Sequence, residues 1–208
     1  MNFNTISIAS PIVWTNDDED GGELYVDDDS MCSVVRDYVV RDIDIEECVV
    51  RKIQVKNILV KSTNGKWFAN PYVGCPAGCA NCIGRHMREY TKHKEPWGSF
   101  VDVKYWTPIV EDVAANECIT ISSITDPYNT YERTYKRTRA LLEEFLSIGH
   151  RCIEIRTKSD LVLRDVDLLR QFDCVVAVCD DSALCTSLRN EGIDVKAITL
   201  HPVHHFHI

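Results

Sequence analysis

The chain has 208 residues, of which 45% are hydrophobic and 26% are charged, a composition that argues against wholesale disorder and suits one domain with a short appendage. No apolar run reaches the about 18 residues that a membrane span needs, and the first residues do not resemble a secretion signal, so we expect a cytoplasmic protein. Of the net charge of −9, residues 1–50 carry −11, so the acidity belongs to the N-terminal segment.

The N-terminal part differs in pattern from the rest. Residues 15–30 are acidic and contain a Gly-Gly pair, which favours a solvated loop or a disordered stretch. Residues 34–61 alternate apolar and charged side chains, and this period of two favours strands with one buried face. We therefore expect a small acidic extension over residues 1–56 and a core over residues 57–208.

Short apolar runs alternate with helix-like stretches from Trp67 onward. The predicted strands are Lys66–Ala69, Ser99–Tyr105, Cys118–Ile124, Cys152–Thr157, Cys174–Cys179 and Val195–Leu200. The predicted helices lie near residues 83–93, 108–115, 130–148, 160–171 and 182–191. Six strands alternating with helices imply an α/β fold with a parallel sheet and right-handed crossovers, that is, a partial (β/α)6 barrel. In such folds the active residues sit where strands end and loops begin.

The stretch Tyr131–Ile148 has the clearest helical period. Its apolar side chains recur on one face, at Leu141, Leu142, Phe145 and Ile148. Gly149 follows, and a glycine just past the last helical residue is a common stop signal. We expect a helix that ends before Gly149.

Three of the ten cysteines stand close together. Cys75, Cys79 and Cys82 are spaced by four and three positions, in a stretch rich in Pro and Gly that favours an irregular loop. Three thiolates can hold an iron–sulfur cubane and leave one iron without a protein ligand. With His86 as a fourth ligand the same thiols would suit a structural zinc ion, and three unrelated buried thiols are a further interpretation.

Four blocks of sequence, in this order, resemble the spore photoproduct lyase-like branch of the radical S-adenosylmethionine (SAM) superfamily. They are Ile58–Ser62 (ILVKS), Asn70–Cys82 (NPYVGCPAGCANC), Thr125–Arg139 (TDPYNTYERTYKRTR) and Thr157–Leu169 (TKSDLVLRDVDLL). The resemblance covers roughly residues 57–179, more than half of the chain. CxxxCxxC is the cluster signature of that superfamily. The resemblance therefore implies a [4Fe–4S] cluster on the three clustered cysteines, with SAM as the second cofactor.

The resemblance also implies residues that contact SAM. Lys158 would bind the SAM carboxylate, and Thr125 and Asp126 would hydrogen-bond SAM or the substrate. Without the resemblance, Lys158 could be a surface lysine, and the Asp126-Pro pair could be an ordinary helix entry. Asn81 stands where the family has an aromatic side chain beside SAM. Ser123 and Ile124 stand where the lesion-repairing lyases have a hydrogen-donating cysteine, which argues against repair of thymine dimers by that route.

Candidate hydrogen-donating residues are Cys179 and Tyr128. Cys179 ends an apolar run and could donate a hydrogen atom or, with Cys174 and Cys185, bind a second cluster, but cysteine is also a common buried core residue and these spacings are not a recognised cluster pattern. Tyr128 could take part in the chemistry or only in packing. The remaining cysteines that begin predicted strands, Cys118, Cys152 and Cys174, are expected in the core. Four histidines crowd the C-terminus, at positions 201, 204, 205 and 207, and could bind metal or belong to a frayed chain end.

The expected function is reductive cleavage of SAM and hydrogen abstraction from an unidentified substrate, for which the family resemblance suggests one derived from nucleic acid. A peptide- or protein-modifying radical SAM enzyme is an alternative, and a non-catalytic metal-binding scaffold is another. As partners we expect SAM and an electron donor such as flavodoxin or ferredoxin, and no membrane.

Overall fold

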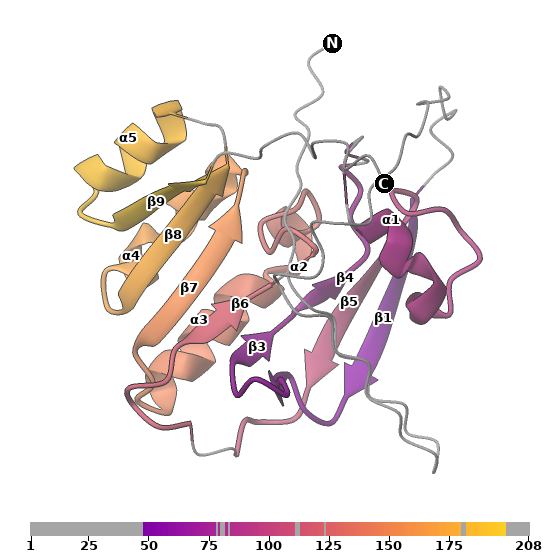
Figure 1. The fold of residues 1–208 in the computed structure, drawn as a ribbon, viewed down its shortest axis with the longest axis horizontal. Coiled ribbons are helices and arrows are strands. Elements are labelled where there is room, and N and C mark those ends of the chain that lie inside the picture. Colours follow the sequence, from indigo (N-terminus) through magenta and orange to yellow (C-terminus); the bar gives the residue numbers. More distant parts are fainter. Residues whose placement is uncertain are drawn as a thin grey trace, which may run out of the picture.

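The computed structural model describes residues 48–77, 79, 82, 84–110, 113–122, 124–179 and 182–198. Its strands form two sheets (Figure 1). The strands are β1 Val49–Val55, β2 Leu59–Lys61, β3 Trp67–Ala69, β4 Tyr72–Val73, β5 Phe100–Trp106, β6 Ile119–Ile121, β7 Cys152–Thr157, β8 Asp173–Cys179 and β9 Asp194–Ile198. The α-helices are α1 Gly84–Met87, α2 Glu132–Tyr135, α3 Arg137–Ser147, α4 Val166–Leu169 and α5 Ser182–Asn190. The 3-10 helices are η2 Arg88–Thr91 and η3 Asp160–Asp165.

The larger sheet has the strand order β2-β3-β6-β7-β8-β9. From β3 to β9 all neighbours are parallel, and β2 is antiparallel to β3. The carboxyl ends of the five parallel strands therefore lie at one edge, as the sequence predicts. Within the described residues the sheet is open, with β2 and β9 at its edges. The partial (β/α)6 barrel stays a prediction.

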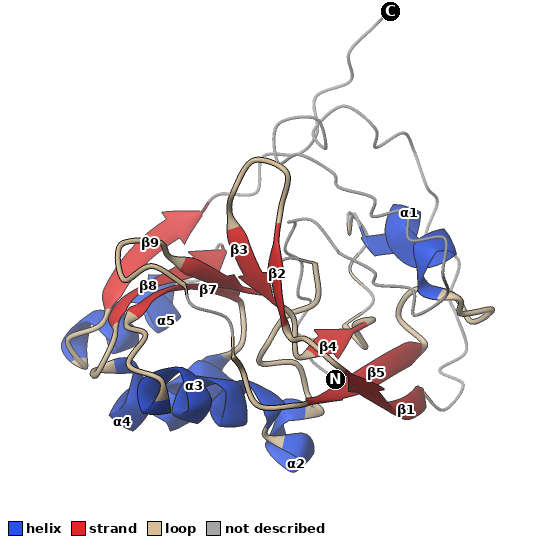
Figure 2. Ribbon diagram, turned by 90° about the horizontal axis from the view of Figure 1, so that it is seen from below, coloured by secondary structure: helices blue, strands red, loops and turns tan. Residues whose placement is uncertain are grey.

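One face of this sheet packs against helices. Figure 2 shows α3, α4 and α5 on the same side of the strands. The strands contribute alternate residues to this core, and the helices contribute their apolar faces: Ile119, Ile121, Ile153, Ile155, Val176, Val178, Leu141, Leu142, Phe145, Leu169 and Leu188. Each such side chain contributes roughly 1.5–3 kcal/mol of transfer free energy when it is fully buried. The apolar side chains that recur every second residue in the strands and about every 3.6 residues in α3 thus pack in one core.

The helical stretch after residue 130 is broken in two. Lys136 has a left-handed backbone (φ 51°), which ends α2 and begins α3. The expectation of apolar packing holds for Leu141, Leu142 and Phe145, but Ile148 is 44% exposed because it caps the helix end and lies outside the last turn. Gly149 has φ +82° and follows that cap, so the predicted stop is confirmed.

The second sheet corrects the predicted strand order. Its order is β1-β5-β4, with β1 parallel and β4 antiparallel to β5. The predicted strand at Ser99–Tyr105 forms as β5, but it lies in this second sheet and not in the parallel one. Its seven-residue register with β1 runs from Val49 opposite Phe100 to Val55 opposite Trp106. The last strand before the expected boundary at residue 56 thus pairs with a strand of the expected core.

A second correction concerns the predicted helix near residues 108–115. The described residues of that stretch, 108–110 and 113–115, are not helical. Ile109 is instead fixed by a hydrogen bond from its backbone N to Glu144 Oε1 (2.6 Å), which holds this connection against α3.

None of the helices in the described part of the chain has the length and apolar character that a membrane span needs.

Candidate functional site

The three clustered cysteines lie in one buried apolar group. Cys75, Cys79 and Cys82 are 2%, 5% and 4% exposed, and none of the three is in a disulfide. They follow β4, and their apolar neighbours are Val73, Trp97, Phe100 and Ile124. Ile124 comes from the segment after β6, so this group joins the cysteine loop to the carboxyl edge of the parallel sheet.

The backbone at the start of this loop requires glycine. Gly74 has φ +79°, and a Cβ built on it would lie 2.3 Å from the backbone oxygen of Phe100. Further along, the amide of Cys82 donates to the carbonyl of Cys79 (3.2 Å), and Arg85 Nε donates to the same carbonyl oxygen (3.2 Å). Close packing on β5 and these local hydrogen bonds fix the course of the loop.

Burial and nearby negative charges both act on the pKa of Cys75. Burial raises the pKa of the Cys75 thiol well above its usual range. The nearby groups Cys82, Asp126 and Cys79 raise this pKa further through their negative charge. Without a metal ion the thiol therefore stays protonated at neutral pH, and a metal that binds here must displace the proton.

Three observations bear on whether these residues fit a [4Fe–4S] cluster. Among the described residues no group of three His, Cys, Asp or Glu side chains is arranged to hold a metal ion. The donor set nevertheless suits iron, because three cysteine side chains outside any disulfide share one apolar, water-poor group. The buried indole Nε1 of Trp97, beside them, has no hydrogen-bond partner among the described residues. The donor chemistry of these residues therefore suits a cluster, although the described side chains are not arranged as a metal site.

Asp126 connects the ends of β6 and β7. Its Oδ1 accepts hydrogen bonds from Tyr128 N (2.7 Å) and Thr157 Oγ1 (2.8 Å), and its Oδ2 accepts one from Lys158 N (3.0 Å). Burial raises the pKa of Asp126 to about 6, although these three donors and the charge of Lys158 act in the opposite direction. Through these contacts Asp126 fixes the chain at Thr157 and Lys158, at the end of β7.

The other predicted SAM-contacting residues have separate outcomes. Thr125 is buried beside Asp126, and Lys158 is half-buried directly after β7, at the predicted edge. Asn81 lies outside the described residues. The structure therefore brings Thr125, Asp126 and Lys158 to the same edge of the sheet as the cysteine loop.

A buried ionic network supports this edge of the sheet. The sequence analysis did not predict its ion pairs. Glu132 is fully buried and accepts hydrogen bonds from Tyr72 Oη, Thr138 N (2.9 Å) and Arg164 Nη2 (2.6 Å). Arg164 also binds Asp165, at 2.8 and 2.6 Å. The signal was present, since these charged residues lie inside the family-like blocks, but spacing alone does not pair them.

The network continues to α3. Arg139 binds Asp165 Oδ1 (2.8 Å) and Asp167 Oδ2 (2.8 Å). Asp165 is completely buried, while Asp167 is exposed. The block at residues 125–139 and the block at residues 157–169 are therefore cross-linked by charge-assisted hydrogen bonds, which are the stronger class. Much of the family-like sequence builds the frame of the site.

The two candidate hydrogen donors are placed differently. Tyr128 is 1% exposed in the main core, and its hydroxyl has no partner among the described residues. Burial raises its pKa well above the usual value, and the charges of Asp165 and Glu132 add to this effect. Cys179 ends β8 at the predicted position, opposite Ile198 of β9, but its side chain is outside the described part. The histidines at the C-terminus also lie outside it.

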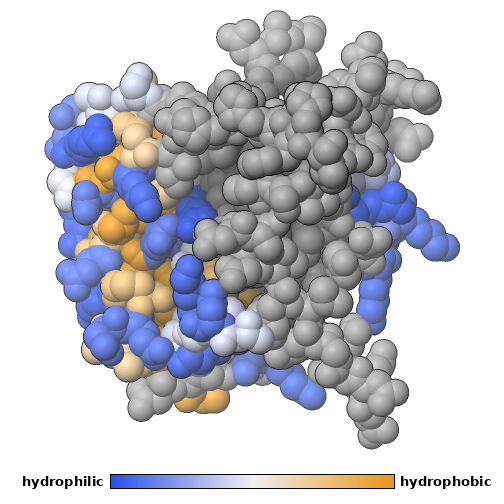
Figure 3. Space-filling model, viewed as in Figure 1, coloured by the Kyte–Doolittle hydropathy of each residue, from blue (hydrophilic) through white to orange (hydrophobic). Residues whose placement is uncertain are grey.

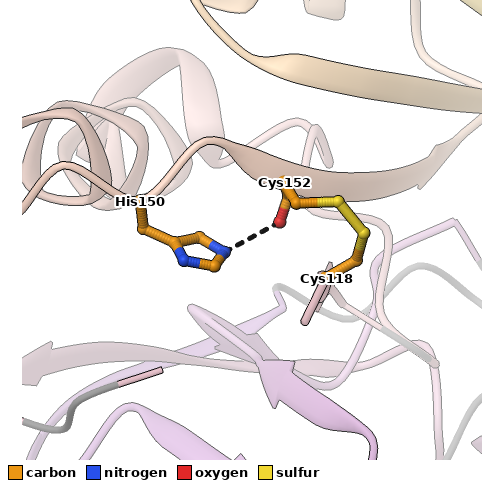
Figure 4. Close-up of a disulfide and its surroundings, with 3 residues drawn as sticks. All are labelled: Cys118, His150 and Cys152. Atoms are coloured by element: carbon orange, nitrogen blue, oxygen red, sulfur yellow. Dashed lines mark hydrogen bonds between the residues drawn. A yellow bond between two sulfur atoms is a disulfide. The ribbon is translucent and has the colours of Figure 1, made fainter. Parts of the chain in front are cut away.

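A disulfide corrects the expectation for two cysteines. Cys118 and Cys152 are bonded to each other at the amino ends of β6 and β7 (Figure 4). His150 Nε2 lies 2.9 Å from the carbonyl oxygen of Cys152 in the same view. Cys118 is exposed and Cys152 half-buried, so neither is a core thiol, whereas Cys174 is buried as expected. The parallel register brings Ile119 opposite Ile153, which places the residues before them side by side.

The sheet face without helices carries charged groups. Figure 3, in the view of Figure 1, shows hydrophilic and hydrophobic side chains side by side over these strands. Glu154 and Arg156 alternate on β7 with the core residues Ile153 and Ile155, and they form an ion pair of 2.9 Å. A polar second face is typical of a sheet that faces a ligand or solvent.

The segment before β5 contains a further polar group that sequence reasoning missed. His93 is buried between Glu95 Oε2 (3.1 Å) and Asp102 Oδ2 (3.0 Å) and stacks on Phe100 at 3.7 Å. Asp102 Oδ1 is buried and has no partner among the described residues. Burial lowers the pKa of Lys104, on the same side of β5, to about 8, and the charge of Asp102 opposes that shift.

A comparison with known proteins finds an archaeal relative. No family model matches the chain. It is 35% identical, over 128 residues, to the uncharacterized protein MJ0683 of Methanocaldococcus jannaschii. The match covers 60% of this chain and 48% of that protein, so the chain spans about half the length of the relative. No solved structure matches.

Proposed function

We propose that this chain is a cytoplasmic radical SAM enzyme built on a partial (β/α)6 barrel, with Cys75, Cys79 and Cys82 as the ligands of a [4Fe–4S] cluster. The observation that carries the proposal is the burial of these three cysteines in one apolar group that also contains Ile124. Two residues after Ile124, Asp126 acts electrostatically on Cys75. The parallel sheet β3-β6-β7-β8-β9 supports the barrel.

The chemistry comes from the cofactors, and the protein supplies their surroundings. When bound, the cluster supplies one electron that breaks the C5′–S bond of SAM into methionine and a 5′-deoxyadenosyl radical, which removes a hydrogen atom from the substrate. Cys75, Cys79 and Cys82 would hold the cluster, and three protein ligands would leave one iron available to SAM. Their burial keeps water away from the reacting groups.

Lys158 and Asp126 orient SAM in this proposal. In this proposal the ammonium of Lys158 would neutralise the SAM carboxylate, and Asp126 Oδ2 accepts a hydrogen bond from the Lys158 backbone N at 3.0 Å. Thr125 and Asn81 would also contact SAM. The ionic network of Glu132, Arg164 and Asp165 holds the segment after Thr125 against the segment after Lys158.

The substrate provides the hydrogen atom, and we propose a nucleic-acid-derived substrate on the basis of the family resemblance. Cys179 and Tyr128 are the proposed residues for hydrogen transfer during turnover. Flavodoxin or ferredoxin supplies the electron. A peptide or protein substrate is the alternative within the same chemistry.

The test is anaerobic reconstitution with iron and sulfide, followed by dithionite and SAM, with 5′-deoxyadenosine measured by mass spectrometry. We expect a cluster and 5′-deoxyadenosine in the wild type and the loss of both in Cys75→Ala, Cys79→Ala and Cys82→Ala. Cys185→Ala is the matched control, because Cys185 is also a buried free thiol but lies in the main core. Binding of zinc in place of a cluster would refute the proposal and favour the scaffold function.

A further inference from the structure

Trp97 lies among the cluster cysteines with an unused donor. Its side chain is 5% exposed and belongs to the same apolar group as Cys75, Cys79 and Cys82. Its Nε1 is buried and has no hydrogen-bond partner among the described residues. Indole N–H groups usually have an acceptor when they are buried, because an unsatisfied donor loses its hydrogen bond to water without replacement.

The position of Gly84 shows where this donor lies. A Cβ built on Gly84 would lie 2.2 Å from Cε2 and Cζ2 of Trp97 and 2.7 Å from its Nε1. The edge of the indole that carries the N–H therefore rests on the backbone of Gly84, two residues after Cys82. Only glycine leaves room for the ring here, so the chain holds the N–H at the end of the cysteine loop.

The ring is also held from its other side. Trp97 packs edge-on against Phe100, with ring centroids 5.7 Å apart and an interplanar angle of 86°. Phe100 in turn contacts Gly74, which precedes Cys75. The indole is thus fixed between the two ends of the cysteine loop, and water is excluded from it.

We propose that Trp97 Nε1–H donates a hydrogen bond to a sulfur of the [4Fe–4S] cluster at its Cys82 side and thereby raises the reduction potential of the cluster. The proposal rests on the proposed function, since it needs the cluster. A hydrogen bond to sulfur stabilises the reduced cluster more than the oxidised one, because the reduced cluster carries one more negative charge. Trp97 is a positioning residue. It would change how readily the cluster accepts an electron, and it would not react with SAM or the substrate itself.

The first measurement is a redox titration of the reconstituted protein, monitored by electron paramagnetic resonance. Trp97→Phe removes the donor and keeps an aromatic ring. We expect the equilibrium constant for reduction to fall at least threefold, which at about 59 mV per tenfold change for one electron is about 28 mV. Trp67→Phe is the matched control, because Trp67 Nε1 already donates to Glu117 Oε2 (3.1 Å) and Trp67 lies in β3.

A second measurement separates the hydrogen bond from a packing effect. In reduced wild-type protein labelled with 15N at the indole nitrogens, we expect electron–nuclear double resonance to detect a 15N coupling to the cluster. This coupling should be absent from Trp97→Phe and present in Trp67→Phe. An unchanged potential, or a changed potential without a 15N coupling in the wild type, would overturn the role of Trp97.

The two proposals fail in different ways. If the wild type forms no cluster, the proposed function fails and the role of Trp97 falls with it. If the wild type forms a cluster and cleaves SAM but shows no 15N coupling, only the role of Trp97 is refuted.

Discussion

The carboxylate of Asp126 accepts a hydrogen bond of 3.0 Å from the backbone amide of Lys158, and so joins the carboxyl ends of two neighbouring parallel strands. Its other oxygen accepts from Thr157 and Tyr128. A completely buried acid with three donors around it sits beside the cysteine loop. This hydrogen bond links the block Thr125–Arg139 to the block Thr157–Leu169.

Asp126→Asn should change how stability depends on pH. In the protein without a cluster the pKa of Asp126 is about 6, whereas an unfolded Asp has a pKa of about 3.9. Between these values the folded state binds a proton that the unfolded state does not, so the free energy of unfolding falls as pH rises. The total loss is about 3 kcal/mol. Urea denaturation at a series of pH values should show this slope in the wild type and not in Asp126→Asn; equal slopes would contradict the burial argument.

Glu132→Gln should strongly destabilise the fold. It removes the charge that pairs with Arg164 at 2.6 Å inside the protein. Removing one partner of a buried ion pair costs about 3–5 kcal/mol. Glu143→Gln is the control, because Glu143 is 54% exposed where it pairs with Arg139. That change should cost less than about 1 kcal/mol in the same denaturation experiment, and similar losses in both variants would show that burial does not decide the effect.

Gly74→Ala should disturb the cysteine loop more than Gly65→Ala does. Both glycines have a positive φ, +79° and +85°, and an L-residue there costs about 1–2 kcal/mol. Only at Gly74 would the new Cβ also meet the Phe100 backbone, which adds about 1–3 kcal/mol. The measurement is the free energy of unfolding, together with the iron bound after reconstitution. Gly65→Ala should bind iron as the wild type does, and a loss of iron in that variant would argue against a local effect at Gly74.

Reducing the Cys118–Cys152 disulfide should lower stability. The bond closes a loop with a sequence separation of 34, and the chain-entropy estimate for such a loop is about 3–4 kcal/mol. Thermal unfolding with and without dithiothreitol checks this, with Cys118→Ser as the variant that should not respond to the reductant. In a reducing cytoplasm the two thiols would be separate. An identical wild-type transition in both conditions would argue against a disulfide in the folded protein.

Local sequence pattern was sufficient for several elements. The strand Cys152–Thr157 forms with the predicted bounds, because its alternation of buried and half-buried residues is a local property. The glycine stop at Gly149 is confirmed for the same reason. The predicted helix Tyr131–Ile148 is interrupted at Lys136, where the Glu132 network draws the backbone of Thr138 and Arg139 inward.

The sequence by itself determined the cysteine spacing, the order of the family-like blocks and most of the strands of the parallel sheet. Only the tertiary structure decided that β5 lies in a second sheet, that Cys118 bonds Cys152, and that Trp97 rests on Gly84. The physical reason is range. Periodicity reports which face of a segment is buried, but strand partners, disulfide partners and buried ion pairs depend on contacts between residues far apart in the chain.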